Sequence, residues 1–262
     1  MQRTITFRPM KRSERFVGWL SRRWLLVFNV SWGAFVIAPW LAPVFMQIGA
    51  TGVGNAIYSV YQFVCHQLPE RSFFLFGTQP MYSLSQVAAV WPADNVDVLR
   101  QFVGNAEFGW KVAYSDRMAA MYTALWFGAI AFVFIRRRVP PLPIWSYVLL
   151  ILPMVIDGGT HLISDVLAGP NFGQGFRDTN VWLAQLTNQA FPASFYAGDA
   201  LGSFNSWMRL LSGVLFGIAS VWLAFPYADA TFNQVREALD DKFKRLGQPI
   251  DRVVRATERN SR

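Results

Sequence analysis

Four long apolar stretches alternate with polar segments along this chain. They lie at residues 24–48, 118–135, 144–162 and 206–226. A helix of about 20 mostly apolar residues spans the roughly 30 Å hydrocarbon core of a bilayer. The pattern therefore predicts an all-α fold, a polytopic membrane helical bundle with about four transmembrane helices.

Basic residues predict how this bundle is oriented. Segment 1–23 carries seven Lys and Arg residues and the single acid Glu14, and three arginines, Arg136 to Arg138, follow the second apolar stretch. Positive residues flanking membrane helices favour the cytoplasmic side. We expect a basic cytoplasmic N-terminal segment 1–23, a membrane domain 24–228 with outer loops 49–117 and 163–205, and a cytoplasmic charged tail 229–262. This is the topology of a multi-pass protein of the cell (inner or plasma) membrane.

The composition supports a membrane location and argues against nucleic-acid binding. Of the 262 residues, 53% are hydrophobic and 15% charged, whereas a soluble domain would be about 25% charged. The net charge of +8 is concentrated at the termini and at one turn, as in proteins that contact anionic lipid surfaces. The lipid bilayer is the expected partner, and no nucleic acid is expected.

Two further segments suggest contacts at the membrane surface. The stretch 57–64 within residues 51–64 is apolar but too short to span, so it either lies along the interface or re-enters the bundle. In the tail, Val235, Leu239, Phe243 and Leu246 recur at helical spacing and form one apolar face. That face is expected to contact lipid head groups, a membrane-protein partner or a second copy of the chain.

Ionisable residues at the end of the third apolar stretch indicate a functional or structural cluster. Asp157, His161 and Asp165 recur every four residues and would share one face of a continuing helix. Charged groups at membrane depth are costly and are rarely accidental. The predicted topology brings these candidate residues to the outer end of the bundle: Cys65, His66, Arg71, Ser72, Arg117, Tyr122, Asp157, His161, Asn205 and Arg209.

Two chemical interpretations of this cluster remain open. Imidazole, carboxylate and thiolate ligands would suit zinc or another divalent metal, and His66, Asp157, His161 and Cys65 could supply them, although their spacing matches no strong metal motif. Alternatively, Asp157 and His161 could join Arg117 and Arg209 in a buried network that holds the helices in register. Because Cys65 is the only cysteine, no intrachain disulfide can form.

Several blocks together resemble the DUF2085 family of uncharacterised membrane proteins over roughly residues 57–226. The blocks are Cys65-His66-Gln67-x-Pro69-Glu70-Arg71-Ser72-Phe73-Phe74, Gly77-x-Gln79-Pro80, Asp157-Gly158-Gly159-Thr160 and Ser203-x-Asn205-x-x-x-Arg209-x-x-Ser212-Gly213. The family usually has a Cys-x-Arg-Cys or Cys-x-Arg-Asp block, whereas this chain keeps Arg117 and Tyr122 but has Ser115 and Met118 at the other two positions. His161 also stands where the family commonly has Gln. The resemblance implies a membrane protein and no particular activity.

Three functions are compatible with the sequence. The first is an accessory or assembly subunit that contacts lipid or partner membrane proteins through the outward-facing polar cluster. The second is a membrane-embedded, metal-dependent hydrolase or transferase acting on a lipid, with Arg71, Arg117 or Arg209 holding an anionic head group. The third, a small transporter, is less favoured because four spans without a broken-helix pair make a poor carrier. Whether the protein is an enzyme is left open by the sequence.

Overall fold

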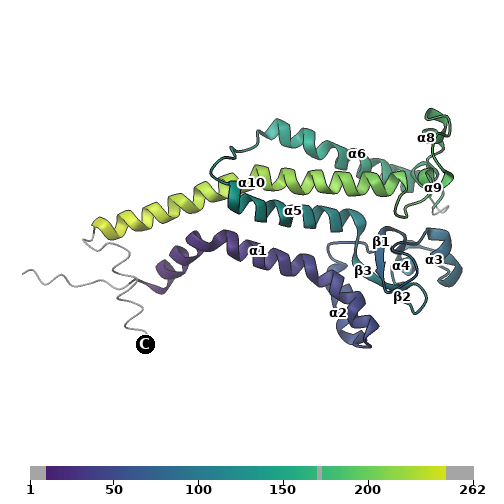
Figure 1. Cartoon of the computed structure of the whole chain (residues 1–262), viewed down its shortest axis with the longest axis horizontal. Coiled ribbons are helices and arrows are strands. Elements are labelled where there is room, and N and C mark those ends of the chain that lie inside the picture. Colours follow the sequence, from purple (N-terminus) through teal and green to yellow (C-terminus); the bar gives the residue numbers. More distant parts are fainter. Residues whose placement is uncertain (1–9, 170–172, 246–262) are drawn as a thin grey trace, which may run out of the picture.

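The computed structural model describes residues 10–169 and 173–245 of the chain, and these are mostly helical. Four of the helices are long and apolar enough to cross a membrane (Figure 1). They are α1 (Arg12–Gln47), α5 (Asp116–Ile135), α6 (Ile144–Ala168) and α10 (Phe204–Arg245). Each contains one of the four predicted spans, so the helical membrane bundle is confirmed at this level.

Three of the long helices extend well beyond the predicted spans. α1 begins within the basic N-terminal segment, α6 continues six residues past 162, and α10 passes through Pro226 to Arg245. Hydropathy shows where the apolar part of a helix ends. It does not show where the helical hydrogen bonding of the backbone ends. Charged residues such as Lys, Arg and Glu are good helix formers, so the helices continue into polar sequence.

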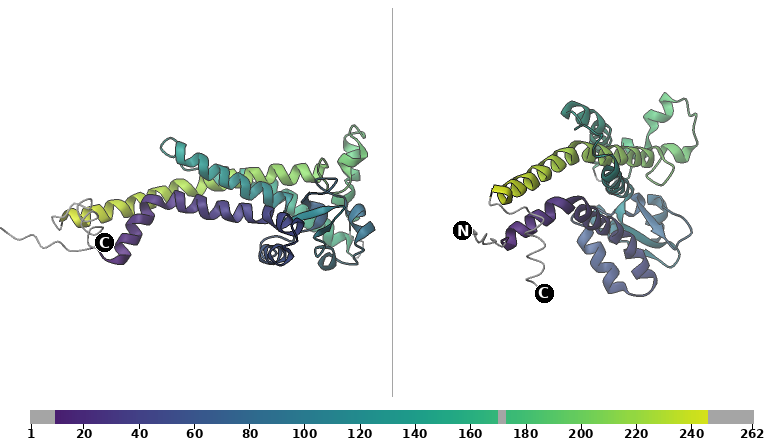
Figure 2. Two further views of the ribbon diagram at one scale, coloured as in Figure 1. Left: turned by 60° about the horizontal axis from the view of Figure 1, so that its bottom comes forward. Right: turned by 60° about the vertical axis from the view of Figure 1, so that its left-hand side comes forward.

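α10 is the central helix of the bundle and contacts α1, α5 and α6. Its closest approach is to α5, where Gly213 and Gly217 have no side chain to hold the backbones apart. A Cβ atom at Gly217 would lie 2.5 Å from the carbonyl oxygen of Met121. Near the other end, Trp24 of α1 stacks against Phe232 of α10, with ring centroids 5.3 Å apart. The beginning of α1 and the end of α10 consequently lie at one end of the molecule (Figure 2).

The opposite end carries a small unit that contains a β-sheet, so the prediction of an all-α chain is wrong here. The sheet is antiparallel with strand order β1-β3-β2, formed by β1 (Ser72–Leu75), β2 (Gly104–Asn105) and β3 (Gly109–Ser115). Four successive residues of β3 are buried, so the strand lacks the polar and apolar alternation that identifies a half-exposed strand. Short helices complete the unit: α2 (Thr51–Tyr61), the 3-10 turn η1 (Pro69–Arg71), α3 (Leu84–Val90) and α4 (Val96–Leu99).

The short apolar segment after the first span forms α2, which packs against α1 and β3. The hydroxyl groups of Tyr58 and Tyr61 donate hydrogen bonds to the carbonyl oxygens of Lys111 and Phe35 respectively. With 11 residues, α2 is only about 16 Å long and cannot span a bilayer. The second outer loop contains three further short helices: α7 (Phe176–Thr179), α8 (Val181–Leu186) and α9 (Ala193–Tyr196).

The apolar face expected in the tail is partly covered by the chain itself. Phe243 is buried against Met10, and Leu239 packs on the same cluster. Beside them Lys242 forms an ion pair of 2.6 Å with Glu14. The end of α10 therefore packs on the start of α1. Leu246, the remaining member of the predicted face, lies outside the described residues.

Candidate functional site

A buried ion-pair network joins the long helices to the outer loops. Arg209 of α10, whose side chain is 2% exposed, makes a two-bond contact with the carboxylate of Asp116 at the start of α5, at 2.7 and 2.8 Å. Its third nitrogen donates to the carboxylate of Asp199 at 2.6 Å. Paired planar groups of this kind combine charge with fixed geometry. The contact sets the position of α5 relative to α10.

Asp199 is shared between two arginines. Arg71, from the turn before β1, donates its Nε to Asp199 at 2.8 Å. Burial opposes ionisation of this carboxyl, but the guanidinium groups of Arg71 and Arg209 outweigh it and hold the pKa of Asp199 far below its usual range. Asp199 is therefore ionised and links the first outer loop, the second outer loop and α10.

A second carboxylate, Asp157 of α6, is likewise held by two arginines. Arg117 of α5 donates to it at 2.6 Å, and Arg177 of α7 donates at 2.7 Å. Arg177 also donates to the side-chain oxygen of Asn205 at 3.0 Å and lies 3.3 Å from Nε2 of His161. Because an arginine can only donate, Nε2 is the accepting nitrogen of His161 and its proton belongs on Nδ1.

A cavity of about 210 Å³ lies beside this network, between the start of α5 and the C-terminal half of α6. Arg71, Arg117 and Arg209 all line it, as do His161 and Asp165. His161 is 4% exposed, and its Nδ1 has no hydrogen-bond partner. Nε of Arg117 is also buried without a partner. His161 and Arg117 thus line the cavity, and each has one buried nitrogen that no group in the described chain pairs with.

The matches to known proteins centre on the same helices. The family model of DUF2085, a predicted membrane protein, matches residues 106–223, which include α5, α6, Asn205 and Arg209. This part of the chain, just under half of its length, is therefore similar to DUF2085 proteins. An uncharacterized protein of Methanocaldococcus jannaschii is 26% identical over 151 residues, covering 54% of this chain and 75% of the relative. No solved structure matches the chain.

The DUF2085 match is shorter than the resemblance seen in the motifs, which began at residue 57. It contains Arg117, Tyr122, Asp157 and His161, while the block from Cys65 to Phe74 lies outside it. The structure nevertheless brings Arg71 from that block into contact with Asp199, which lies within the region that the family model matches. The outer loop and this region together therefore form the cavity.

Cys65 and His66 both line the cavity but differ in exposure. Cys65 is buried, and its sulfur accepts hydrogen bonds from the backbone N–H groups of Gln67 at 3.3 Å and Ser115 at 3.2 Å. Its sulfur also lies 3.6 Å from the hydroxyl oxygen of Ser115. His66 is exposed at the rim.

Three of the remaining predicted site residues have structural contacts. The buried Ser72 donates its hydroxyl to the carbonyl oxygen of Leu68 at 2.8 Å. Tyr122 packs in an aromatic group with Trp32 and Phe35 and does not line the cavity. Asn205 accepts from Arg177 and holds the second outer loop onto α10.

The proposed metal ligands do not form a metal centre. Among the residues that the structure describes, no three His, Cys, Asp or Glu side chains are grouped so that they could hold a metal ion. The reason is visible in their contacts: Asp157 is occupied by two arginines, the sulfur of Cys65 by backbone N–H groups, and Nε2 of His161 faces Arg177. The metal hypothesis is not supported.

Three members of the network, Asp116, Arg177 and Asp199, were not among the predicted site residues. Arg177 is the only basic residue of the second outer loop, a signal that could have identified it. Asp199 follows a glycine in a loop without periodicity, and no local pattern distinguishes it from a surface aspartate. The positions of Arg177 and Asp199 in the network are determined by tertiary contacts alone.

A separate buried pair of ionisable residues lies beneath the sheet. Lys111 of β3 is fully buried and donates to the carbonyl oxygens of Gln67 at 2.8 Å and Arg100 at 2.9 Å. Burial lowers the pKa of Lys111 to about 7 and raises the pKa of Glu70 to about 7. The backbone acceptors of Lys111 fix the loop that precedes β1, and with it Arg71.

Proposed function

We propose that this protein is an accessory membrane protein whose outward-facing polar cluster binds an anionic lipid head group of the phosphate type. The binding site is the cavity between the outer ends of α5 and α6. The observation that carries the proposal is the pair of unsatisfied donors, Nδ1 of His161 and Nε of Arg117, in residues that line this cavity.

The physical argument rests on what these donors require. A buried N–H without a partner costs about 1–3 kcal/mol. Arginine binds phosphate and carboxylate groups through several parallel N–H bonds. Both nitrogens are themselves buried, so an anion would accept from them only after their side chains turn, but the positive charges of Arg71, Arg117 and Arg209 already line the cavity. Asp165, at the exposed rim, opposes such an anion, so its charge provides a direct test.

The cavity's place in the membrane follows from charge. The end of the molecule opposite the sheet carries most of the basic residues of the described chain, among them Arg22, Arg23, Arg136, Arg137 and Arg138. The preference of such residues for the cytoplasm favours cytoplasmic ends for α1 and α10 and an outer-facing cavity. In a cell membrane, the cavity would then lie at the level of the outer head groups.

Binding can be measured with the protein in phosphatidylcholine nanodiscs, titrated with dihexanoyl phosphatidic acid, dihexanoyl phosphatidylcholine or inorganic phosphate. We expect the phosphatidic acid to bind and the zwitterionic lipid not to bind. His161→Phe removes the free donor and should weaken binding about tenfold or more, the value of a hydrogen bond to a charged group.

Asp165→Asn is the matched variant because it alters the same cavity at an exposed position. Removing this negative charge should tighten anion binding about two- to fivefold. If Asp165→Asn bound phosphatidic acid more weakly than the unmodified protein or equally well, the proposal would be contradicted. This result would hold even if the His161→Phe variant failed to fold. Inorganic phosphate that binds as tightly as the lipid would show that the site takes a soluble anion instead.

A further inference from the structure

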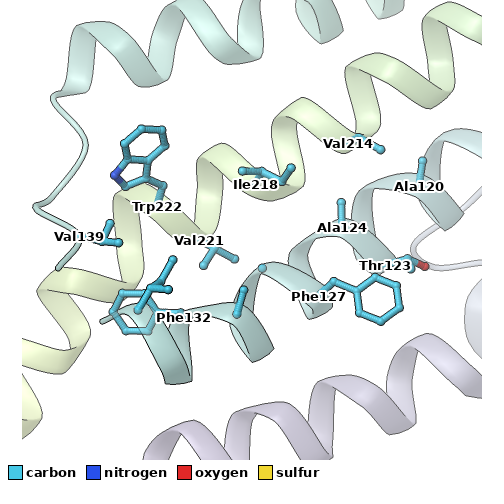
Figure 3. A pocket seen from close by; sticks show the side chains of 13 residues that line it. Ala120, Thr123, Ala124, Phe127, Phe132, Val139, Val214, Ile218, Val221 and Trp222 are labelled. Carbon is cyan, nitrogen blue, oxygen red and sulfur yellow. The ribbon is translucent and has the colours of Figure 1, made fainter. Parts of the chain in front are cut away.

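A long apolar groove lies on the membrane-spanning part of the molecule, between α5 and α10 (Figure 3). Its volume is about 690 Å³, within the range of pockets that hold a small molecule. Ala120, Thr123 and Phe127 of α5 face Val214 and Ile218 of α10 across it. Val139, in the turn after α5, lies at its inner end.

The groove and the polar cavity share one face of α5. Arg117 lines the cavity, and Ala120, three residues later, begins the groove. Residues at this spacing lie on the same side of a helix, about 4.5 Å apart along its axis. The groove then follows the face through Ala124, Gly128 and Ala131. Small residues along this line leave the space that forms the groove.

α6 leaves this space uncovered. It contributes Gly158, His161 and Leu162 to the polar cavity but none of the groove's lining residues. α6 is also the least buried of the four long helices, and it runs apart from α5 across the groove (Figure 3). The cavity and the groove are therefore the outer and inner parts of the same side of the bundle.

We infer that the groove holds the hydrocarbon chain of a membrane lipid whose anionic head group occupies the cavity. This inference rests on the proposed function and specifies its ligand as a long-chain anionic amphiphile. From Ala120 to Ile135 the groove follows α5 for about 22 Å, longer than the roughly 15 Å of one leaflet. Such a groove suits an extended chain lying along the helix.

Charge selects this occupant over a helix. The arginines and His161 at the outer end of the groove complement an anionic head group attached to the chain. The groove itself is lined by apolar residues and Thr123, with no charged group for a polar partner. A second copy of the chain is therefore the alternative to be tested.

The experiment compares radiolabelled hexyl, dodecyl and hexadecyl phosphate for binding to the protein in phosphatidylcholine nanodiscs, with empty discs correcting for partition. Inside a bilayer, the chain gains packing contacts and no further removal from water. We therefore expect a modest preference, about fivefold for hexadecyl over hexyl phosphate after correction. Ala131→Trp fills the groove at an exposed position and should abolish this preference while hexyl phosphate still binds.

Val133→Trp is the matched control, because Val133 is an exposed residue of α5 that does not line the groove. It should behave as the unmodified protein does. The groove inference would be overturned if Ala131→Trp and Val133→Trp showed the same preference for hexadecyl over hexyl phosphate while both still bound hexyl phosphate. The proposed function would then still stand. If the unmodified protein did not bind hexyl phosphate, both the groove inference and the proposed function would be overturned. A change of oligomeric state in Ala131→Trp alone would assign the groove to a second copy.

Discussion

Asp199 joins two arginines of the polar network, because two guanidinium groups share its carboxylate. Arg209 is 2% exposed and pairs with both Asp116 and Asp199, while Arg71 pairs with Asp199. Removing one partner of a buried pair leaves an uncompensated charge. The residues of this network therefore contribute to stability as well as to the shape of the cavity.

Asp199→Asn should destabilise the protein by about 3–5 kcal/mol, because it leaves the charges of Arg71 and Arg209 without this acceptor. Asp97→Asn is the control, since Asp97 forms an exposed pair with Arg100 at 3.3 Å and should change stability by less than about 1 kcal/mol. Thermal unfolding in detergent measures both. Similar melting temperatures for the two variants would show that the buried network adds little.

Glu70 gives the protein a specific dependence of stability on pH. Burial raises the pKa of its carboxyl from the ordinary 4.5 to about 7, so the folded state binds a proton more tightly than the unfolded state. The resulting stabilisation is complete below about pH 4.5 and is lost as pH rises through 7. Lys111 has the opposite effect at higher pH: its lowered pKa gives stability above about pH 10.5 that is lost as pH falls through 7.

Glu70→Gln should remove the first of these effects, and it should lower the pKa of Lys111 further because the Glu70 carboxylate raises it. Between pH 4.5 and 7, the unmodified protein should lose on the order of 2 kcal/mol relative to this variant. Glu107→Gln, an exposed change in the same outer unit, should show no such difference. Melting temperatures recorded across pH 4 to 9 would provide the comparison; parallel curves for the unmodified protein and Glu70→Gln would refute the assignment.

Among the elements, the long helices follow directly from the sequence because each must bury a continuous apolar surface. The sequence also predicts that Asp157 and His161 lie on one face of α6. Residues four positions apart are neighbours on a helix surface, and the helix continues through both. Asp165 lies on the exposed side of the same cavity.

The sheet was not predictable, because β3 is buried along most of its length and contains Lys111 among apolar residues. Asp199 depends on a loop path that no local pattern specifies.

The contact between α5 and α10 depends on glycine, and a pair of single substitutions tests it. Gly217→Ala would place a Cβ 2.5 Å from the carbonyl oxygen of Met121, which requires the helix backbones to separate. We expect a loss of about 1–3 kcal/mol. Gly159→Ala in α6 has no neighbour within 4 Å and should instead stabilise its helix by up to about 1 kcal/mol. Melting temperatures that shift in the same direction would contradict this helix arrangement.

At the scale of the whole molecule, the ends of the bundle differ in structure and charge. The sheet and most of the short helices lie at one end, while the start of α1 and the end of α10 lie together at the other (Figure 1). Residues of the turn before β1 line the polar cavity, which therefore belongs to the sheet end. Four crossings by these candidate helices would place the two helix ends on the same side of a membrane. The concentration of arginine and lysine at that end favours the cytoplasm, and head-group binding at the outer surface requires this orientation.

Cysteine labelling in intact cells tests the orientation. In a Cys65→Ser background, Ser85→Cys places a thiol on the exposed surface of α3, and Thr231→Cys places one on the exposed surface of α10 beyond Pro226. A membrane-impermeant maleimide should label residue 85 in intact cells and residue 231 only after permeabilisation. The reverse pattern would place the cavity at the cytoplasmic surface, where the same donors would face the inner leaflet. Labelling of both positions in intact cells would contradict a bundle whose two ends lie on opposite sides of the membrane.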